Sequence, residues 1–571
     1  MPLAPSPMPL LELKNLNVSF QTLEGSFHAV KDLSFSIGEG ESLAIVGESG
    51  SGKSVSMRAV LGLLDKKSID AISGEAWFYS DDHKLNLLGD QKSLKGIRGK
   101  QIGMIFQEPM TALNPVMRCG KQIMEVVTTH LALSKAEAKA HVHHLLDEVQ
   151  LTDIPRMLRS YPHELSGGQR QRIMIAMALA ANPRLLIADE PTTALDVSVQ
   201  SAILKLIRRL QKERNMALIF ISHDLGVVKE IADRTLVMFR GKKLEEGESD
   251  SLFSNPAHIY TRALIQCRPS AHRSGHLLPV MSDFFSINEQ GEFVEKTFVP
   301  TKELGSKNRT KEVLIEISGL EVSYRRLGMW GASGEKNAVI RSIDLQIFKG
   351  ETLGVLGESG SGKSTTGRAI MQLIRYDGTI RMRDEVLHPA RAADRKKLAK
   401  KIQMIYQDPY SSLNPKYRIG ESFMEIMQCH GIHKKNNERT IHGQALLVKV
   451  GLDAGAWNKY PHEFSGGQRQ RIAIARALLV EPEFIVCDEA VSALDVSVQA
   501  QILNLLKEIQ REFGITYLFI THDLQVVRNI ADRILVLNKG KIAELQETEA
   551  LFANPGDSYT KTLLASYSHL E

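Results

Sequence analysis

Cysteine is scarce in this chain, which has only four among 571 residues: Cys119, Cys267, Cys429 and Cys487. No two of them stand at CxxC spacing, so the sequence predicts neither a disulfide framework nor a zinc site. This usage is typical of a protein that works in a reducing compartment.

Long apolar runs are missing as well. The longest are short and interrupted, as in IMIAMALAANPRLLIADE, which contains Asn182, Pro183 and Arg184. None reaches the roughly 20 apolar residues that a transmembrane helix needs. The opening MPLAPSPMPL has no basic segment ahead of an apolar stretch, so it does not have the pattern of a signal peptide. Any role at a membrane is therefore expected to depend on partner proteins.

Charge of one sign is not in excess either. The 71 basic and 66 acidic residues leave a net charge of +5, whereas nucleic-acid-binding proteins usually carry a clustered basic excess. This balance argues against a nucleic-acid partner. The length and the 43% content of hydrophobic residues allow each half of the chain to bury a core of its own.

What the chain does have is a long internal repeat. The string YPHELSGGQRQR (161–172) returns as YPHEFSGGQRQR (460–471), and 26 of the 40 positions that start at these strings are identical. GESGSGKS likewise occurs at 47–54 and again at 357–364. A self-similarity of this extent indicates two copies of one domain.

Each copy contains short apolar runs that alternate with helical patterns. ESLAIVG and ETLGVLG lead into glycines, and the segments directly after them have helical spacing of apolar residues. Alternating strands and helices predict α/β lobes with a mostly parallel core sheet. Segments 11–20 and 315–324 alternate apolar and polar residues, as half-exposed antiparallel strands do. We therefore expect domains at 11–267 and 313–571, joined by a linker at 268–312 with one short strand pair.

Both copies of GESGSGKS match the phosphate-loop pattern G-x-x-x-x-G-K-[ST], between a strand and a helix as its mechanism requires. The glycines let backbone N–H groups surround phosphates, and the helix N-terminus adds the positive end of its dipole. The lysine of each loop would reach the β- and γ-phosphates, and the last serine would bind Mg²⁺. The predicted ATP-binding residues are Gly47, Glu48, Ser49, Gly50, Ser51, Gly52, Lys53 and Ser54, and Gly357, Glu358, Ser359, Gly360, Ser361, Gly362, Lys363 and Ser364.

An acidic pair ends one apolar strand in each copy. Asp189 and Asp488 stand where an aspartate can hold Mg²⁺ through water. Glu190 and Glu489 follow directly, so their carboxylates should leave the strand on the other face and polarise an attacking water. The alternative is a solvated acidic pair without a catalytic role.

A histidine ends another apolar strand in each copy. His223 and His522 could reach the γ-phosphate, although a single strand-end histidine is more often structural.

The repeated SGGQ string has two interpretations. Ser166 and Ser465 precede two glycines and a helix-forming run, which is the composition of a helix N-cap. A helix start with free N–H groups is also an anion site, and its ligand would be the γ-phosphate held by the other lobe. The second interpretation explains the doubling, because each lobe then supplies half of each ATP site.

These motifs, in this order, resemble the nucleotide-binding domains of ABC transporters. The combination with ALD at 194–196 and 493–495 is highly specific, and the likeness extends over both lobes. It implies two tandem P-loop domains, each with a mostly parallel core sheet, an antiparallel β subdomain and a helical subdomain. The family positions fall on Gln107 and Gln407 (the loop that senses Mg²⁺ and the permease), Phe20 and Tyr324 (an aromatic ring on adenine), and Asp196 and Asp495 (the loop that links the two sites).

Two further segments narrow the resemblance. FQEPMTALNP and YQDPYSSLNP (106–115 and 406–415) are similar to a stretch of the dipeptide, oligopeptide, nickel and glutathione importers, and NPAHIYTRAL and NPGDSYTKTL to their C-terminal trailer. Many members carry a cysteine cluster for an iron–sulfur centre after that trailer. Only Cys267 stands there in this chain, so we predict no iron–sulfur cluster.

The resemblance implies a mechanism with ATP and Mg²⁺ at two sites between the lobes. Binding closes the lobes and hydrolysis opens them, which drives two integral membrane permease subunits fed by an external substrate-binding protein. The chain would then lie peripherally at the cytoplasmic face of the inner membrane. Site one would combine Lys53, Ser54, Asp189, Glu190 and His223 with Ser465, Gly466, Gly467 and Gln468; site two would combine Lys363, Ser364, Asp488, Glu489 and His522 with Ser166, Gly167, Gly168 and Gln169.

Two other classes of two-domain ABC ATPase remain as alternatives. Proteins of this type that act on ribosomes usually join their lobes by a long charged helical hairpin, for which 268–312 is short and irregular. DNA-repair and chromosome ATPases need zinc modules or long coiled coils, and neither pattern occurs. Co-purification with ribosomes, DNA or integral membrane proteins would separate the three.

Overall fold

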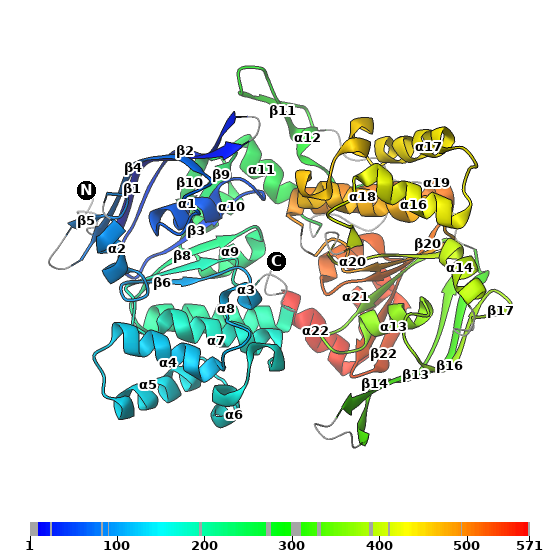
Figure 1. Ribbon diagram of the computed structural model, residues 1–571, viewed down its shortest axis with the longest axis horizontal. Helices are drawn as coiled ribbons and strands as arrows, with labels where there is room; N and C mark the ends of the chain where they lie inside the picture. The colour runs from blue at the N-terminus through cyan, green and yellow to red at the C-terminus, as the bar shows by residue number, and fades with distance from the viewer. Residues whose placement is uncertain are drawn as a thin grey trace.

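The computed structural model describes residues 9–22, 25–80, 84–89, 91–192, 197–269, 276–298, 310–327, 333–387, 392–408, 412–492 and 494–568. Asp196, expected in the loop that links the two sites, lies outside these residues. Figure 1 shows two lobes side by side, one coloured blue to green and the other light green through yellow to red, each with sheets flanked by helices. The expected tandem α/β architecture is confirmed.

Each lobe contains a six-stranded and a four-stranded sheet. In the first lobe the orders are β10-β9-β3-β8-β7-β6 and β2-β1-β4-β5. The strands are β1 (Leu11–Thr22), β2 (Gly25–Ile37), β3 (Ser42–Val46), β4 (Ile69–Tyr79), β5 (Lys84–Asn86), β6 (Ile102–Ile105), β7 (Leu185–Asp189), β8 (Ala217–Ser222), β9 (Arg234–Phe239) and β10 (Lys242–Glu248). Five strands of the larger sheet are parallel, and β10 is antiparallel to β9.

The burial of the strands follows their sequence pattern. Every residue of β3, β7 and β8 is buried, because helices cover both faces of a parallel sheet and select continuous apolar runs. β1 mixes buried and exposed positions and pairs antiparallel with β2 and β4. The predicted antiparallel strand at 11–20 is therefore confirmed. Because the parallel strands end at one edge, the loops after β3, β7 and β8 lie close together there.

The helices of the first lobe form the sheet covers and a helical subdomain of α4, α5 and α6, which packs on α7. They are α1 (Lys53–Val60), α2 (Gln91–Ile97), α3 (Pro109–Ala112), α4 (Cys119–His130), α5 (Lys135–Glu148), α6 (Ile154–Arg159), η1 (Pro162–Glu164), α7 (Gly167–Leu179), α8 (Val197–Glu213), α9 (Leu225–Ile231), α10 (Ser249–Ser254) and α11 (Ile259–Gln266).

The second lobe repeats this plan, with sheets ordered β18-β19-β20-β15-β21-β22 and β14-β13-β16-β17. Its strands are β13 (Val313–Leu327), β14 (Ser333–Phe348), β15 (Thr352–Leu356), β16 (Asp377–Met382), β17 (Glu385–Val386), β18 (Ile402–Ile405), β19 (Phe484–Asp488), β20 (Thr516–Ile520), β21 (Arg533–Asn538) and β22 (Lys541–Glu547). Its helices are α13 (Lys363–Ile370), α14 (Ala392–Lys401), α16 (Ile419–His430), α17 (Asn436–Lys449), η3 (Ala454–Asn458), η4 (Pro461–Glu463), α18 (Gly466–Leu478), α19 (Val496–Phe513), α20 (Leu524–Ile530), α21 (Thr548–Ala553) and α22 (Ser558–Ser568).

The connector between the lobes, described at 276–298, is packed against both of them. It holds α12 (Met281–Phe284) and the predicted strand pair, β11 (Phe285–Ile287) with β12 (Phe293–Glu295). Phe284 and Phe285 belong to the core of the first lobe, whereas Leu278 is buried in that of the second.

Candidate functional site

The phosphate loop of each lobe links a buried parallel strand to a helix. In the first lobe it runs from β3 to α1, and Gly47 and Gly52 have φ values of 149° and 99°. A Cβ on Gly47 would lie 2.1 Å from the carbonyl oxygen of Met238, and one on Gly52 2.5 Å from that of Ala29. Both positions therefore require glycine for their conformation and for the space around them.

The loop lysine folds back over its own loop. Lys53 is 5% exposed, and its Nζ donates to the carbonyl oxygens of Gly47 (2.7 Å) and Glu48 (2.9 Å). Lys363 makes the same pair of contacts in the second lobe, at 2.6 and 2.9 Å. Burial lowers the pKa of the Lys53 ammonium, and the carboxylates around it act in the opposite direction. A triphosphate in this loop would supply the negative charge that favours the ammonium form.

The serine after each lysine meets the strand-end aspartate. Ser54 Oγ donates to Asp189 Oδ1 at 2.5 Å, and Ser364 Oγ donates to Asp488 Oδ1 at 2.8 Å. A hydroxyl beside a carboxylate is the kind of oxygen donor pair that Mg²⁺ prefers. The residues present therefore fit the predicted Mg²⁺ ion. Burial raises the pKa of the Asp488 carboxyl.

The sequence analysis missed an arginine that contacts the aspartate of the first serine–aspartate pair. Arg58 of α1 donates from Nη2 to Asp189 Oδ2 at 3.1 Å, and Asp189 is fully buried. The signal was available, since Arg58 and Arg368 occupy the same place after each phosphate loop.

The glutamate of each acidic pair contacts a different set of groups from its aspartate neighbour. Glu190 accepts from Gln107 Nε2 at 2.8 Å and lies 3.3 Å from His223 Nδ1. Its backbone φ is 47°, in the left-handed region, so the chain leaves the extended geometry of β7 at this residue. The predicted glutamate, glutamine and histidine are thus brought together in the first lobe.

The second lobe repeats this triple. Glu489 accepts from Gln407 Nε2 at 2.7 Å and lies 3.4 Å from His522 Nδ1. Burial alone would raise the pKa of Glu489, but the hydrogen bond and charge of His522 outweigh it, so the pKa is lowered. Burial alone would lower the pKa of His223, but the hydrogen bond and charge of Glu190 outweigh that and raise it. The lowered pKa of Glu489 and the raised pKa of His223 each favour a carboxylate paired with a protonated imidazole.

The SGGQ strings start α7 and α18. Ser166 Oγ accepts from the Gln169 N–H at 3.3 Å, and Gln169 Oε1 accepts from the Ser166 N–H at 3.0 Å; Ser465 and Gln468 repeat both distances. The predicted N-caps are confirmed as capping boxes. Ser166 and Ser465 are exposed.

The two glycines of each string meet different surroundings. A Cβ on Gly168 would lie 2.7 Å from Val199, and one on Gly467 2.3 Å from Val498, so close packing of helices requires the second glycine. Among the residues that the structure describes, a Cβ on Gly466 would meet only Leu494, at 3.9 Å, which is an ordinary van der Waals contact.

The two lobes meet at the phosphate loop of the first. The Ser49 N–H donates to Asp495 Oδ2 at 3.0 Å, and Ser497 Oγ donates to the Glu48 carboxylate. Burial raises the pKa of Glu48, and the hydrogen bond from Ser497 opposes this rise. Sequence reasoning identified Asp495 but missed Ser497, which lies two residues further along the same repeat.

The predicted adenine-stacking residues lie on the antiparallel sheets. Phe20 is half-buried in β1, and Tyr324 is 46% exposed in β13. Phe27, directly opposite Phe20 in β2, is 56% exposed, and no pattern in the sequence predicted this cross-strand pair.

Comparisons with known proteins agree with this geometry. The family described as "ABC transporter" matches residues 30–193 and 340–492, and "Oligopeptide/dipeptide transporter, C-terminal region" matches 244–282. The glutathione import ATP-binding protein GsiA of Salmonella paratyphi A is 43% identical over 563 residues, which is 98% of this chain and 89% of that protein. The protein of that name from Escherichia coli K12 is 43% identical over 570 residues, with the same coverage.

A solved dimeric structure of the ATP-binding cassette MJ0796, bound to ADP and Pi, matches 42% of this chain and 98% of its own, with 29% identity and a TM-score of 0.37. No helix in the described part of the chain is long and apolar enough to cross a membrane. The ribosomal and DNA-repair alternatives find no support among these relatives. The chain belongs to the ABC transporter family and is an ATP-binding protein of that family that hydrolyses ATP.

Proposed function

We propose that the chain powers the import of small peptides, glutathione among them, by closing and opening its two domains around ATP. The domains are 11–267 and 313–571, and 268–312 joins them. The proposal draws its substrate class from relatives that are glutathione import ATP-binding proteins and from the oligopeptide/dipeptide transporter region at 244–282.

The hydrogen bond from the Ser49 N–H to Asp495 is the observation that best supports ATP sites built from both lobes. It joins a loop that follows the second lobe's acidic pair to the phosphate loop of the first. Ser465 starts the helix that packs on α19, the helix capped by Asp495. Lobe closure at this contact would therefore bring the exposed Ser465 and Gly466 toward the γ-phosphate held by Lys53.

Each site would work through groups that the lobes already hold in place. Glu190 takes a proton from the water that attacks the γ-phosphorus, and the bond from that phosphorus to the ADP oxygen breaks. Gln107 and His223 orient Glu190, while Lys53 and the trans helix start bind the phosphate oxygens. Mg²⁺, held by Ser54, Asp189 and Gln107 or by Ser364, Asp488 and Gln407, would neutralise negative charge on the phosphates.

The permeases would dock beside Gln107. A pocket of about 580 Å³ lies there, lined by Arg58, Leu63, Phe106, Gln107, Glu108, Thr111 and Ala112. Leu63 and the neighbouring Met110 are 41% and 47% exposed, and exposed apolar groups around a pocket suit a short permease helix. The same loop carries Gln107, so docking and catalysis would be coupled. With permeases docked in this way, the chain would lie peripherally at the cytoplasmic face of the membrane, with an external binding protein on the other side.

The test uses the chain purified with its permeases, the binding protein and membrane lipid. Glutathione, dipeptides and longer peptides should stimulate ATP hydrolysis, and free amino acids should not. In a Glu489→Gln background only site one turns over, and Ser465→Arg should lower that rate by about 10³-fold or more.

Ser166→Arg is the matched control, because it alters the helix start assigned to site two and should leave turnover at site one. Undiminished hydrolysis in the Ser465→Arg chain would exclude the cross-lobe site. A rate that no peptide changes would exclude the proposed substrate class.

A further inference from the structure

One peptide unit of the first phosphate loop is held from both sides. The Gly47 carbonyl accepts from Lys53 Nζ at 2.7 Å, and the N–H of the same unit, on Glu48, donates to the hydroxyl oxygen of Tyr260 at 3.2 Å. Tyr260 lies on α11, some 200 residues away in the chain. The tyrosine thus fixes the orientation of the carbonyl on which the loop lysine rests.

The second lobe makes the same arrangement. The Gly357 carbonyl accepts from Lys363 Nζ at 2.6 Å, and the Glu358 N–H donates to the Tyr559 hydroxyl at 3.1 Å. Both copies of the repeat make this contact, although the three residues before the tyrosine differ: 257–259 read AHI and 556–558 read GDS.

Both tyrosines lie at the start of a helix that is itself anchored. In the first lobe Glu245 of β10 accepts from the N–H groups of Ala257 and His258 at 2.8 and 3.2 Å. His258 Nδ1 in turn accepts from the Tyr260 N–H at 3.1 Å. The anchor makes the hydroxyl a fixed acceptor rather than a mobile one.

Glu544 of β22 plays the same part in the second lobe, accepting from Gly556 and Asp557 at 2.7 and 3.2 Å. Asp557 replaces His258 as the cap and accepts from the Tyr559 N–H at 2.8 Å. The chemistry of the cap differs, yet the hydroxyl reaches the same atom.

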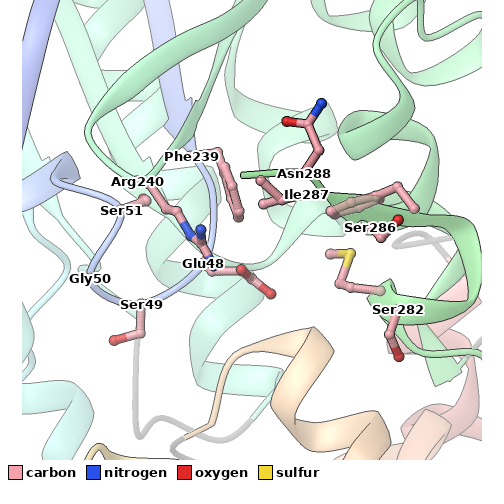
Figure 2. A pocket seen from close by; sticks show the side chains of 12 residues that line it. Glu48, Ser49, Gly50, Ser51, Phe239, Arg240, Ser282, Ser286, Ile287 and Asn288 are labelled. Atoms are coloured by element: carbon pink, nitrogen blue, oxygen red, sulfur yellow. The ribbon is translucent and has the colours of Figure 1, made fainter. Parts of the chain in front are cut away.

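Within its described residues, the connector contacts the ring of the first tyrosine through Phe285. Tyr260 is fully buried, and its ring centroid lies 4.6 Å from that of Phe239 and 6.3 Å from that of Phe285. A pocket of about 650 Å³ lies beside this cluster, and Figure 2 shows Glu48 and Arg240 entering it. Tyr559 is only half-buried.

We propose that Tyr260 and Tyr559 are positioning residues for ATP binding, which hold the first peptide of each phosphate loop and, through its carbonyl, the loop lysine. Neither hydroxyl touches the reacting atoms. Loss of the hydroxyl lets the peptide rotate, so the binding-competent loop is populated for a smaller fraction of the time and the apparent affinity for ATP falls by that fraction.

The inference rests on the proposed assignment of the two ATP sites, so the test is made in the full chain with Glu489→Gln. There Tyr260→Phe should raise the KM for ATP at site one by about three- to tenfold, the effect of one lost hydrogen bond. The kcat should change by less than about twofold, because the catalytic glutamate is untouched. Titration with a fluorescent ATP analogue should show the same rise in Kd.

Tyr559→Phe in the same background is the control and should leave the KM of site one unchanged. In a Glu190→Gln background the two variants should exchange their effects. An unchanged KM in Tyr260→Phe overturns the inference, and so does a lowered melting temperature with an unchanged KM, because the hydroxyl would then serve packing alone. Failure of the site assignment is recognised separately, by a Glu489→Gln chain whose turnover does not respond to Ser465→Arg.

Discussion

At the scale of single residues, the two lobes place the same side chain in different surroundings. Glu48 lies at the contact between the lobes and accepts from Ser497, whereas its counterpart Glu358 is exposed. Burial raises the pKa of Glu48 above its usual 4.5. Ionisation of this carboxyl therefore opposes folding: the cost is absent well below pH 4.5, grows as the pH rises through the unfolded and then the folded pKa, and is constant above both.

Glu48→Gln should consequently stabilise the chain at neutral pH, since the amide removes the charge and its oxygen still accepts from Ser497. A gain of about 1 kcal/mol would raise the melting temperature by roughly 2 to 4 °C at pH 7.5. The gain should shrink at pH 5, where Glu48 is more protonated. Calorimetry at the two pH values measures this. Glu358→Gln, as the exposed control, should shift neither transition, and a Glu48→Gln chain that melts earlier at pH 7.5 would contradict the account.

At the scale of elements, the signature helices combine a feature that the sequence predicts with one that it hides. Ser465 in front of a helix-forming run predicts an N-cap, and the capping box with Gln468 confirms it. The need for Gly467 was not predictable, because it arises from the close approach of Val498 on α19. Local chemistry is readable from a single segment, but packing between two segments is not.

Gly467→Ala and Gly466→Ala should therefore differ. The methyl at 467 would lie 2.3 Å from Val498, and overpacking of about 1 to 3 kcal/mol exceeds or cancels the roughly 1 kcal/mol that alanine gains in a helix. Among the described residues the methyl at 466 meets only Leu494, at 3.9 Å, so the gain of alanine in a helix is not offset there and the melting temperature should not fall. If the proposed cross-lobe site is right, this methyl would stand where the γ-phosphate approaches and should lower turnover at site one by about tenfold in the Glu489→Gln chain.

Thermal unfolding and ATPase rates of the two variants give the comparison. The opposite pattern, with stability lost at 466 and activity kept, would show that the first glycine serves packing and not the approach of a phosphate.

At the scale of the whole molecule, the connector ties the lobes together more closely than its composition suggests. Its residues 276–278 bind the second lobe, 281–298 pack on the first, and the chain then enters β13. The sequence predicted the short strand pair, and the repeat predicted both lobes. The glutamate, glutamine and histidine that it singled out lie together in each lobe. The sequence could not predict this double attachment, because no periodicity marks the connector's contacts, and those with the second lobe join residues more than 200 positions apart.

One side chain of the second lobe makes two hydrogen bonds to the connector. Asn504 of α19 accepts from the Leu278 N–H at 2.8 Å and donates to the Leu278 carbonyl at 2.7 Å, as a neighbouring strand would. Beside it Lys507, 3% exposed, donates to the His276 carbonyl at 2.8 Å. The hairpin formed by β11 and β12 has an internal hydrogen bond, in which Asn288 Oδ1 accepts from the Glu292 N–H at 2.8 Å.

Asn504→Ala should release the connector from the second lobe while the hairpin stays on the first. Two lost hydrogen bonds of about 0.5 to 1.5 kcal/mol each would speed exchange of the Leu278 amide by roughly five- to 150-fold. Hydrogen–deuterium exchange measured by mass spectrometry on peptides from 276–298 resolves the two ends. Asn288→Ala, the control, should speed exchange at Glu292 alone. If the Leu278 amide stays protected in the Asn504→Ala chain, the account is wrong. Lys507 and the apolar packing of Leu278 would then hold the connector on the second lobe without the Asn504 side chain.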